Sequence, residues 1–171
     1  SFMLVASMNP SPGGYFNDPD APLSSSPAEM QRYLGKISGP LLDRIDIHIE
    51  VTPVPFEKLS EERKGERSNE IRTRVTDARE IQRIRFEGYE NVHYNAQMGS
   101  KQIRKFCRLD QASMTLLKNA MDRLNLSARA YDRILKVART IADLGHSELL
   151  NSVHIAEAIQ YRSLDREGWL G

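Results

Sequence analysis

The hydrophobic and polar positions divide the chain into a short first part with strand-like patterns and a longer helical part. Residues 2–6, Phe-Met-Leu-Val-Ala, are apolar without interruption, which is typical of a strand buried on both faces in a parallel sheet. Residues 45–51 alternate between apolar and polar side chains, which predicts a strand with one buried face. Two strands do not form a stable sheet by themselves, so we expect the chain to be the tail of a longer protein, cut just before a central strand.

The region between these strands predicts a loop followed by short helices. Residues 10–27 are rich in Pro, Gly and Ser and predict a long surface loop. Ser26 then provides an N-cap for a helix to about Gly35, because Pro and Glu follow at the first and third helical positions. A short helical turn over residues 41–44 leads into the second strand.

The rest of the chain predicts a helical bundle. Residues 53–67 begin with proline and become rich in charge, and we interpret them as a linker. After them, apolar residues recur at helical spacing behind the candidate N-caps Ser68, Ser100, Asp110, Ser127 and Ser152. In the helix from Ser68 the spacing predicts one buried face, made of Ile71, Val75, Ala78, Ile81 and Ile84. The predicted fold is mainly α: about two strands and short helices at the end of a truncated α/β core (1–52), the linker (53–67) and a helical domain (68–171).

Composition mainly excludes certain classes of protein and site. The 24 Lys and Arg nearly balance the 23 Asp and Glu, so the net charge of +1 gives no global basic field that would favour nucleic acid. One cysteine excludes a disulfide framework and a cysteine-rich zinc site. The histidines lack metal-ligand spacing, so no metal site is predicted. No apolar run approaches the ~20 residues that span a bilayer, and no signal peptide is recognisable, which predicts a cytoplasmic protein without a membrane partner.

Two polar residues beside the predicted strands have chemistry that suits phosphate. Asn9 directly follows the first strand, and ligands of open α/β sheets lie beyond the carboxyl ends of strands. Its carboxamide can donate to a phosphate oxygen and accept from an attacking water, although an Asn-Pro turn also explains it. Arg44 lies between an apolar turn and a strand, where a firmly held guanidinium suits the charge of a phosphoryl-transfer transition state. A local salt bridge with Asp43 or Asp46 is the alternative.

Two groups of basic residues lie on predicted helices. Arg129, Arg133 and Lys136 share the polar side of the helix from Ser127, and Arg129 in its first turn lies beside a helix N-terminus, where anions bind readily. Arg72, Arg79 and Arg83 line one side of the helix from Ser68 and suit a phosphate backbone. For the first group the alternative is a solvated basic face, and for the second it is a solvated face with salt bridges.

Two further sequence features argue against chemistry carried by this chain alone. Cys107 lies between apolar neighbours and has no identifiable His or Asp partner, so we expect a buried small hydrophobe and no nucleophile. The sequence contains no G-x-x-x-x-G-K-[ST] phosphate loop.

Five stretches together carry a family resemblance. They read FMLVASMNP (2–10), SGPLLDRID (38–46), KFCRLD (105–110), LSARAYDRILKVARTIADL (126–144) and IAEAIQYR (155–162). In this order, from residue 2 to about 166, the chain resembles the magnesium-chelatase-like AAA+ ATPases, most closely those of the ComM competence type.

The resemblance implies a role for each candidate. Asn9 would be sensor 1, which orients water near the γ-phosphate, and Arg44 would be the arginine finger, which reaches the nucleotide of the neighbouring subunit. Arg129 would be the sensor-2 arginine of the helical lid and would contact the nucleotide together with Arg133. The helix from Ser68 would be the extra helix that this clade inserts before sensor 2.

The resemblance also implies cofactors and partners. ATP and Mg²⁺ are expected in the full-length protein, and none for this fragment. A homo-oligomeric ring, expected to be a hexamer, and DNA are the implied partners. The Walker A and B motifs and a Lon-protease-like domain would lie upstream of Ser1. Many relatives read NPCPCGY where this chain has NPSPGGY at residues 9–15, so no metal knuckle is expected in that loop.

Three functions follow as hypotheses. The first is the C-terminal fragment of an AAA+ ATPase that remodels DNA by branch migration during natural transformation, inactive alone because its Walker motifs are elsewhere. The second is the ATPase subunit of magnesium chelatase in tetrapyrrole metal insertion. The third is a non-enzymatic helical module whose arginines are merely surface residues.

Overall fold

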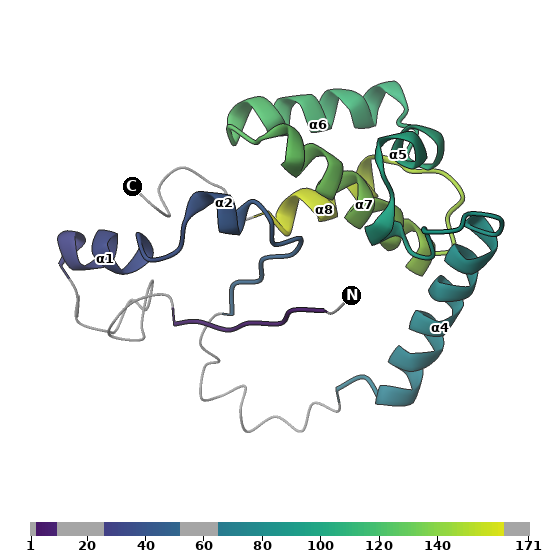
Figure 1. Cartoon of the computed structure of the whole chain (residues 1–171), viewed down its shortest axis with the longest axis horizontal. Coiled ribbons are helices and arrows are strands. Elements are labelled where there is room, and N and C mark those ends of the chain that lie inside the picture. The colour runs from purple at the N-terminus through teal and green to yellow at the C-terminus, as the bar shows by residue number, and fades with distance from the viewer. Residues whose placement is uncertain (1–2, 10–25, 52–64, 163–171) are drawn as a thin grey trace.

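The computed structural model describes residues 3–9, 26–51 and 65–162 (Figure 1). The predictions for residue 2, for most of the 10–27 loop, for most of the linker and for residues 163–171 lie outside the described residues. In the described residues every regular element is helical: α1 (Pro27–Leu34), α2 (Gly39–Leu42), α4 (Ser68–Arg85), the 3₁₀ turn η1 (Asn95–Gln97), α5 (Ser100–Phe106), α6 (Gln111–Arg123), α7 (Ala128–Leu144) and α8 (Ser152–Gln160).

The described residues contain neither of the two predicted strands. Residues 3–9 and 45–51 have no regular secondary structure, and Met3 and Val51 are 87% and 86% exposed. A strand is held by N–H and C=O partners on a neighbouring strand, and the described part of the chain offers no such neighbour. The mainly helical class is confirmed, whereas strands of an α/β core are not.

Local capping signals are accurate at three helix starts. At α1 the Glu29 N–H donates to Ser26 Oγ (3.3 Å) and the Ser26 N–H donates to Glu29 Oε2 (2.9 Å), which completes the predicted capping box. Asp110 accepts from the Ser113 N–H at α6 (2.7 Å), and Ser127 accepts from the Ala130 N–H at α7 (3.1 Å). The three helices therefore begin where a short polar side chain satisfies an N–H of the first turn.

At the other three predicted caps the boundary is displaced by one residue. Ser68, Ser100 and Ser152 are the first helical residues of α4, α5 and α8, and the caps are Arg67, Gly99 and Asn151. Asn151 Oδ1 accepts from the N–H groups of Val153 and His154 (3.1 and 3.3 Å), which explains why it replaces Ser152 as the cap.

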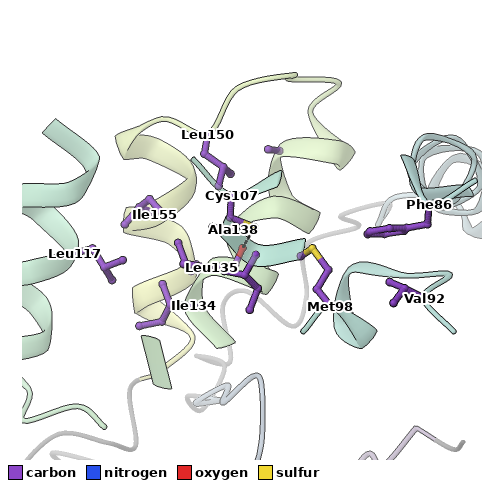
Figure 2. Close-up of a cluster of buried hydrophobic side chains, with 13 residues drawn as sticks. Phe86, Val92, Met98, Cys107, Leu117, Ile134, Leu135, Ala138, Leu150 and Ile155 are labelled. Atoms are coloured by element: carbon purple, nitrogen blue, oxygen red, sulfur yellow. Dashed lines mark hydrogen bonds between the residues drawn. The ribbon is translucent and has the colours of Figure 1, made fainter. Parts of the chain in front are cut away.

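Helix α7 is the centre of the bundle. It contacts α4, η1, α5 and α8, and α6 packs on α8. Its buried apolar side chains recur every three or four residues and share one cluster with side chains from α5, α6 and α8 and from the segments that flank η1 (Figure 2). The main buried cluster contains Phe86, Val92, Met98, Ile103, Cys107, Leu117, Ile134, Leu135, Ala138, Ala142, Leu150, Ile155 and Ala158.

Helix α4 packs on the bundle only through its C-terminal half. Its predicted apolar face is wrong for Ile71, Val75 and Ile84, which are exposed, whereas Ala78 is buried and Ile81 half-buried. Every residue from Gly65 to Asp77 is exposed, because the helix runs away from the bundle toward its N-terminal end (Figure 1). Periodicity identified the helix but not how far its neighbours extend along it.

A buried polar network joins the C-terminal end of α4 to α7. Asp143 is 1% exposed and accepts from Arg85 (2.5 and 2.6 Å), Asn95 (2.8 Å) and Arg139 (3.1 Å). Arg139 also donates to the carbonyl oxygens of Ser147 and Glu148. A buried carboxylate requires paired charge and hydrogen bonds, and Asp143 has both.

Candidate functional site

The segment that follows α2 is fastened to the first half of α7. Ser127 Oγ, while it caps α7, donates to Asp43 Oδ1 across 2.8 Å. Six residues further along, Arg133 forms an ion pair with Asp46. Residues 43–46 are therefore held beside the N-terminal end of α7 although more than eighty residues separate them in the sequence.

The C-terminal end of α8 holds the same segment. Arg162, which is 1% exposed, donates to the carbonyl oxygen of Ile45 and approaches Asp43 Oδ1 within 4.0 Å. The backbone N–H of His48 donates to the carbonyl oxygen of Tyr161 (2.8 Å). Contacts from α7 and α8 thus fix the backbone on both sides of Arg44.

Arg44 itself remains exposed. Its Nη1 donates to the Pro40 carbonyl oxygen in α2 (2.6 Å), and no ion pair joins it to Asp43 or Asp46 in the described residues. Those two carboxylates contact Ser127, Arg162 and Arg133 instead. The local salt bridge that was the alternative explanation of Arg44 is therefore not formed.

The basic residues of α7 divide into one unengaged arginine and two engaged cations. Arg129 is exposed and has no hydrogen-bond or ion-pair partner in the part of the chain that the structure describes. Arg133 is paired with Asp46. Lys136 is half-buried and donates to the Ala96 carbonyl oxygen (3.0 Å), and burial lowers the pKa of its ammonium group although nearby Asp46 opposes that shift. Of these three cations, only Arg129 has all of its N–H donors available for an anion.

Asn9 is not in contact with the other candidates. Its backbone carbonyl oxygen accepts from the Tyr33 hydroxyl (2.9 Å), and its side chain is exposed. Among the described residues no direct contact joins it to Arg44 or Arg129. The structure brings the Arg44 segment and the Arg129 helix together and leaves Asn9 apart.

The three arginines on α4 are unequal. Arg83 is paired with Glu80 (2.7 Å), and the Arg79 guanidinium lies over the Tyr94 ring (4.7 Å) and donates to its hydroxyl (3.0 Å). Arg72 has no partner among the described residues. The expected alternative of a salt-bridged face therefore accounts for Arg83, and an aromatic contact accounts for Arg79.

Cys107 is buried as predicted. Its thiol lies 3.7 Å from the Leu135 carbonyl oxygen (Figure 2), and burial raises its pKa to about 11. Since the thiolate is the nucleophilic form, this position disfavours catalysis.

Arg129 fits a nucleotide phosphate because its guanidinium is exposed beside the N-terminal end of α7. The described residues include no group of three or more His, Cys, Asp or Glu side chains placed to hold a metal ion. None of the described helices is both long enough and apolar enough to cross a membrane.

Sequence reasoning missed the residues that hold the segment around Arg44 against α7 and the end of α8. Asp43 and Asp46 were noted only as possible partners of Arg44, and Arg162 was not noted as a site residue. The available signal was the pair of acids on either side of Arg44, which indicated that this segment needs cationic partners. The sequence did not indicate which distant arginines supply them.

Comparison with known proteins places the chain among magnesium chelatase sequences. The family model described as "Magnesium chelatase, subunit ChlI" matches residues 1–59, and the model "Magnesium chelatase, subunit ChlI C-terminal" matches residues 65–162. The competence protein ComM of Haemophilus influenzae is 42% identical over 96% of this chain and 31% of its own length. The uncharacterized protein YifB of Escherichia coli is 40% identical over the same shares, and the uncharacterized protein Mb2921c of Mycobacterium bovis is 36% identical over 94% and 31%. The chain thus spans about a third of the length of these relatives.

Proposed function

Because the chain belongs to the family of magnesium chelatase subunit ChlI, we propose that it is the C-terminal part of a ring-forming cytoplasmic AAA+ ATPase that remodels DNA. The similarity to a competence protein over 96% of the chain supports the DNA-processing role, and the 31% share of that relative supports a longer functional protein. In this proposal residues 1–52 complete an α/β core, residues 53–67 are a linker, and residues 68–171 form the lid, with α4 as the helix before sensor 2.

The proposal assigns a role to each candidate residue. Arg44 is the finger that reaches the nucleotide of the next subunit, Arg129 is the sensor-2 residue of its own subunit, and Asn9 is sensor 1. Arg133 contributes to the nucleotide site by positioning, since its ion pair with Asp46 aligns α7 with the Arg44 segment. The arginines of α4 remain a weaker proposal for DNA contact, because two of the three are engaged within the chain.

The role proposed for Arg129 rests on a contrast with its neighbours on α7. Ser127 and Arg133 are bound to the segment that carries Arg44, whereas Arg129 between them is exposed and without a partner in the described residues. An exposed guanidinium that is carried by a firmly packed helix and has no acidic partner of its own suits a site that stabilises phosphoryl charge.

The proposal also accounts for the exposed apolar segments. Residues 3–6 and 45–51 would become strands when the rest of the core supplies the neighbouring strands that a sheet requires. ATP and Mg²⁺ would be bound mainly by that upstream part, so this chain alone is expected not to hydrolyse ATP. Their chemistry would be phosphoryl transfer to water, with Arg44 and Arg129 stabilising charge on the phosphate oxygens.

A complementation experiment in the longer protein tests the two arginine roles. Arg44→Ala and Arg129→Ala should each abolish ATP hydrolysis, because each removes one cation from every site. If Arg44 acts across the subunit boundary and Arg129 acts within its own subunit, a mixed ring contains some sites with both arginines. An equimolar mixture of the two variants should therefore recover about a quarter of the wild-type rate of ATP hydrolysis if the subunits mix at random.

The control is Lys118→Ala, which removes an exposed cation from α6 and should leave hydrolysis unchanged. A normal rate for Arg44→Ala would remove the finger role. A mixture that stays inactive, although both variants are shown to enter the same rings, would contradict the division of roles between neighbouring subunits.

A second candidate is the ATPase subunit of magnesium chelatase, and the names of both family models favour it. The two functions differ in what stimulates hydrolysis. Branched DNA should raise the ATPase rate of a DNA-remodelling ring, whereas a chelatase subunit should respond only to its protein partners and to the porphyrin that receives Mg²⁺.

A further inference from the structure

One segment of the chain is basic without any compensating acid. Residues 91–109 contain Lys101, Arg104, Lys105 and Arg108 and no Asp or Glu, so the segment has a net charge of +4. Since the whole chain has a net charge of +1, the remaining residues together carry −3. The balanced composition therefore conceals a local concentration of positive charge.

The fold places this charge on one face of α5. At 3.6 residues per turn, Lys101, Arg104 and Lys105 fall within an arc of about 100°, and all three are exposed. Arg108 is exposed two residues beyond the end of the helix. The opposite side of the helix enters the core through Ile103. This packing fixes α5 against α7 and directs the cations outward.

No carboxylate in the described part of the chain forms an ion pair with any of these four cations. This distinguishes them from the arginines of α4, where Arg74 and Arg83 are paired with Glu66 and Glu80. A face whose cations are unpaired has a stronger potential toward an external polyanion than a face of the same composition that is neutralised by its own acids.

Lys105 is held in place by aromatic side chains. Its Nζ lies 5.0 Å from the centroid of the Phe106 ring and 5.6 Å from that of Tyr89, and it donates to the Tyr89 hydroxyl (3.1 Å). Contact with two aromatic rings restricts the long side chain without neutralising it. The cost of ordering Lys105 on binding an anion is correspondingly reduced.

We propose that the basic face of α5, made of Lys101, Arg104, Lys105 and Arg108, binds the phosphate backbone of nucleic acid. The biological role of this binding rests on the proposed DNA-processing function. The binding itself does not require ATP. Lys101 and Arg108 are seven positions apart, roughly 10 Å at 1.5 Å per residue, which matches about three phosphates of one strand at 3.4 Å each. Contacts of this kind are made to phosphate, so we expect little dependence on base sequence.

The test measures binding of a fluorescein-labelled oligonucleotide to the 171-residue chain at several salt concentrations, by anisotropy. The double variant Lys101→Gln/Arg104→Gln should weaken binding at least tenfold at low salt and reduce the slope of log affinity against log salt by about two. The matched variant Lys118→Gln/Arg123→Gln removes the same charge from exposed positions of α6 and should change affinity less than threefold. Circular dichroism and the urea midpoint check that both variants fold like the parent.

Three results would overturn the proposal. One is binding that the α5 variant leaves unchanged, and another is a loss that the α6 variant reproduces in full. The third is competition by a polyglutamate peptide as effective as competition by unlabelled oligonucleotide, which would indicate an acidic protein partner. None of them affects the ATPase proposal, which depends on Arg44 and Arg129 in the complementation experiment.

Discussion

Arg85, the last residue of α4, and Asp143, near the end of α7, form a bidentate ion pair with Nη–Oδ distances of 2.5 and 2.6 Å. The Asp143 carboxylate is fully enclosed, and the Arg85 side chain is 12% exposed. The same carboxylate also accepts from Arg139 and Asn95, so one acid joins α4, η1 and α7.

Replacing this acid should be among the most destabilising single changes in the bundle. Asp143→Asn leaves two buried guanidinium groups without their counter-charge, and we expect a loss of about 3–5 kcal/mol in the free energy of unfolding. Urea denaturation followed by circular dichroism measures it. Asp122→Asn, an exposed acid on α6, is the control and should stay within about 0.5 kcal/mol of the parent. Equal effects of the two changes would contradict the network.

The cap of α7 should matter more than the serine that begins α8. Ser127→Ala removes both the acceptor for the Ala130 N–H and the donor to Asp43, and should cost about 1 kcal/mol. Ser152→Ala should cost less than about 0.5 kcal/mol, because Asn151 supplies the cap there. A double-mutant cycle of Ser127→Ala with Asp43→Ala should give a coupling energy of about 0.5–1 kcal/mol, and additive effects would show that the Ser127–Asp43 bond is not formed in solution.

Two arginines of α7 should separate function from stability. Arg139 is 2% exposed and bonds Asp143 and two carbonyl oxygens, so Arg139→Ala should destabilise the bundle by about 3 kcal/mol. Arg129 is exposed and lacks partners in the described residues, so Arg129→Ala should change the free energy of unfolding by less than about 0.5 kcal/mol. If Arg129→Ala proved as destabilising as Arg139→Ala, loss of ATP hydrolysis in that variant would no longer indicate a nucleotide contact.

The buried thiol predicts a specific dependence on pH. Desolvation raises the pKa of Cys107 from 9.0 to about 11, so burial of the neutral thiol contributes stability that is fully present below the unfolded-state pKa. This contribution is lost as the pH rises through the folded-state pKa, and it amounts to roughly 3 kcal/mol. Between about pH 9 and 11 the parent should therefore lose more stability than Cys107→Ala, as measured by urea denaturation at each pH. Parallel pH profiles for the two proteins would indicate that the thiol is not buried in solution.

The sequence allowed accurate predictions where the determining contact is local. The capping groups Ser26, Asp110 and Ser127 act within three residues of themselves, and the central helix α7 has an apolar repeat that tertiary packing does not override. The three displaced caps are wrong by a single residue. At α8 the neighbouring Asn151 takes the N–H groups of the first turn, whereas Arg67 and Gly99 precede α4 and α5 without a side-chain cap bond.

The predictions failed where the determining partner is distant in the sequence or lies outside the described residues. Residues 45–51 alternate as a strand does, but a strand forms only against another strand. Ile71 and Val75 have helical spacing, but spacing does not reveal where the bundle ends. The Arg133–Asp46 pair joins residues 87 positions apart, and nothing in the local pattern distinguishes an arginine that finds such a partner from one, like Arg129, that does not.

The way α4 leaves the bundle has a mechanical consequence. Its 18 residues extend about 27 Å at 1.5 Å per residue, and only the C-terminal half is anchored, by Ala78, Gln82 and the Arg85–Asp143 pair. The unanchored part, from Ser68 to Ala78, is therefore an arm of about 15 Å at 1.5 Å per residue. A tilt of about 10° where its contact with the bundle begins displaces the Ser68 end by roughly 3 Å, so a small adjustment inside the bundle moves the point where the chain enters α4.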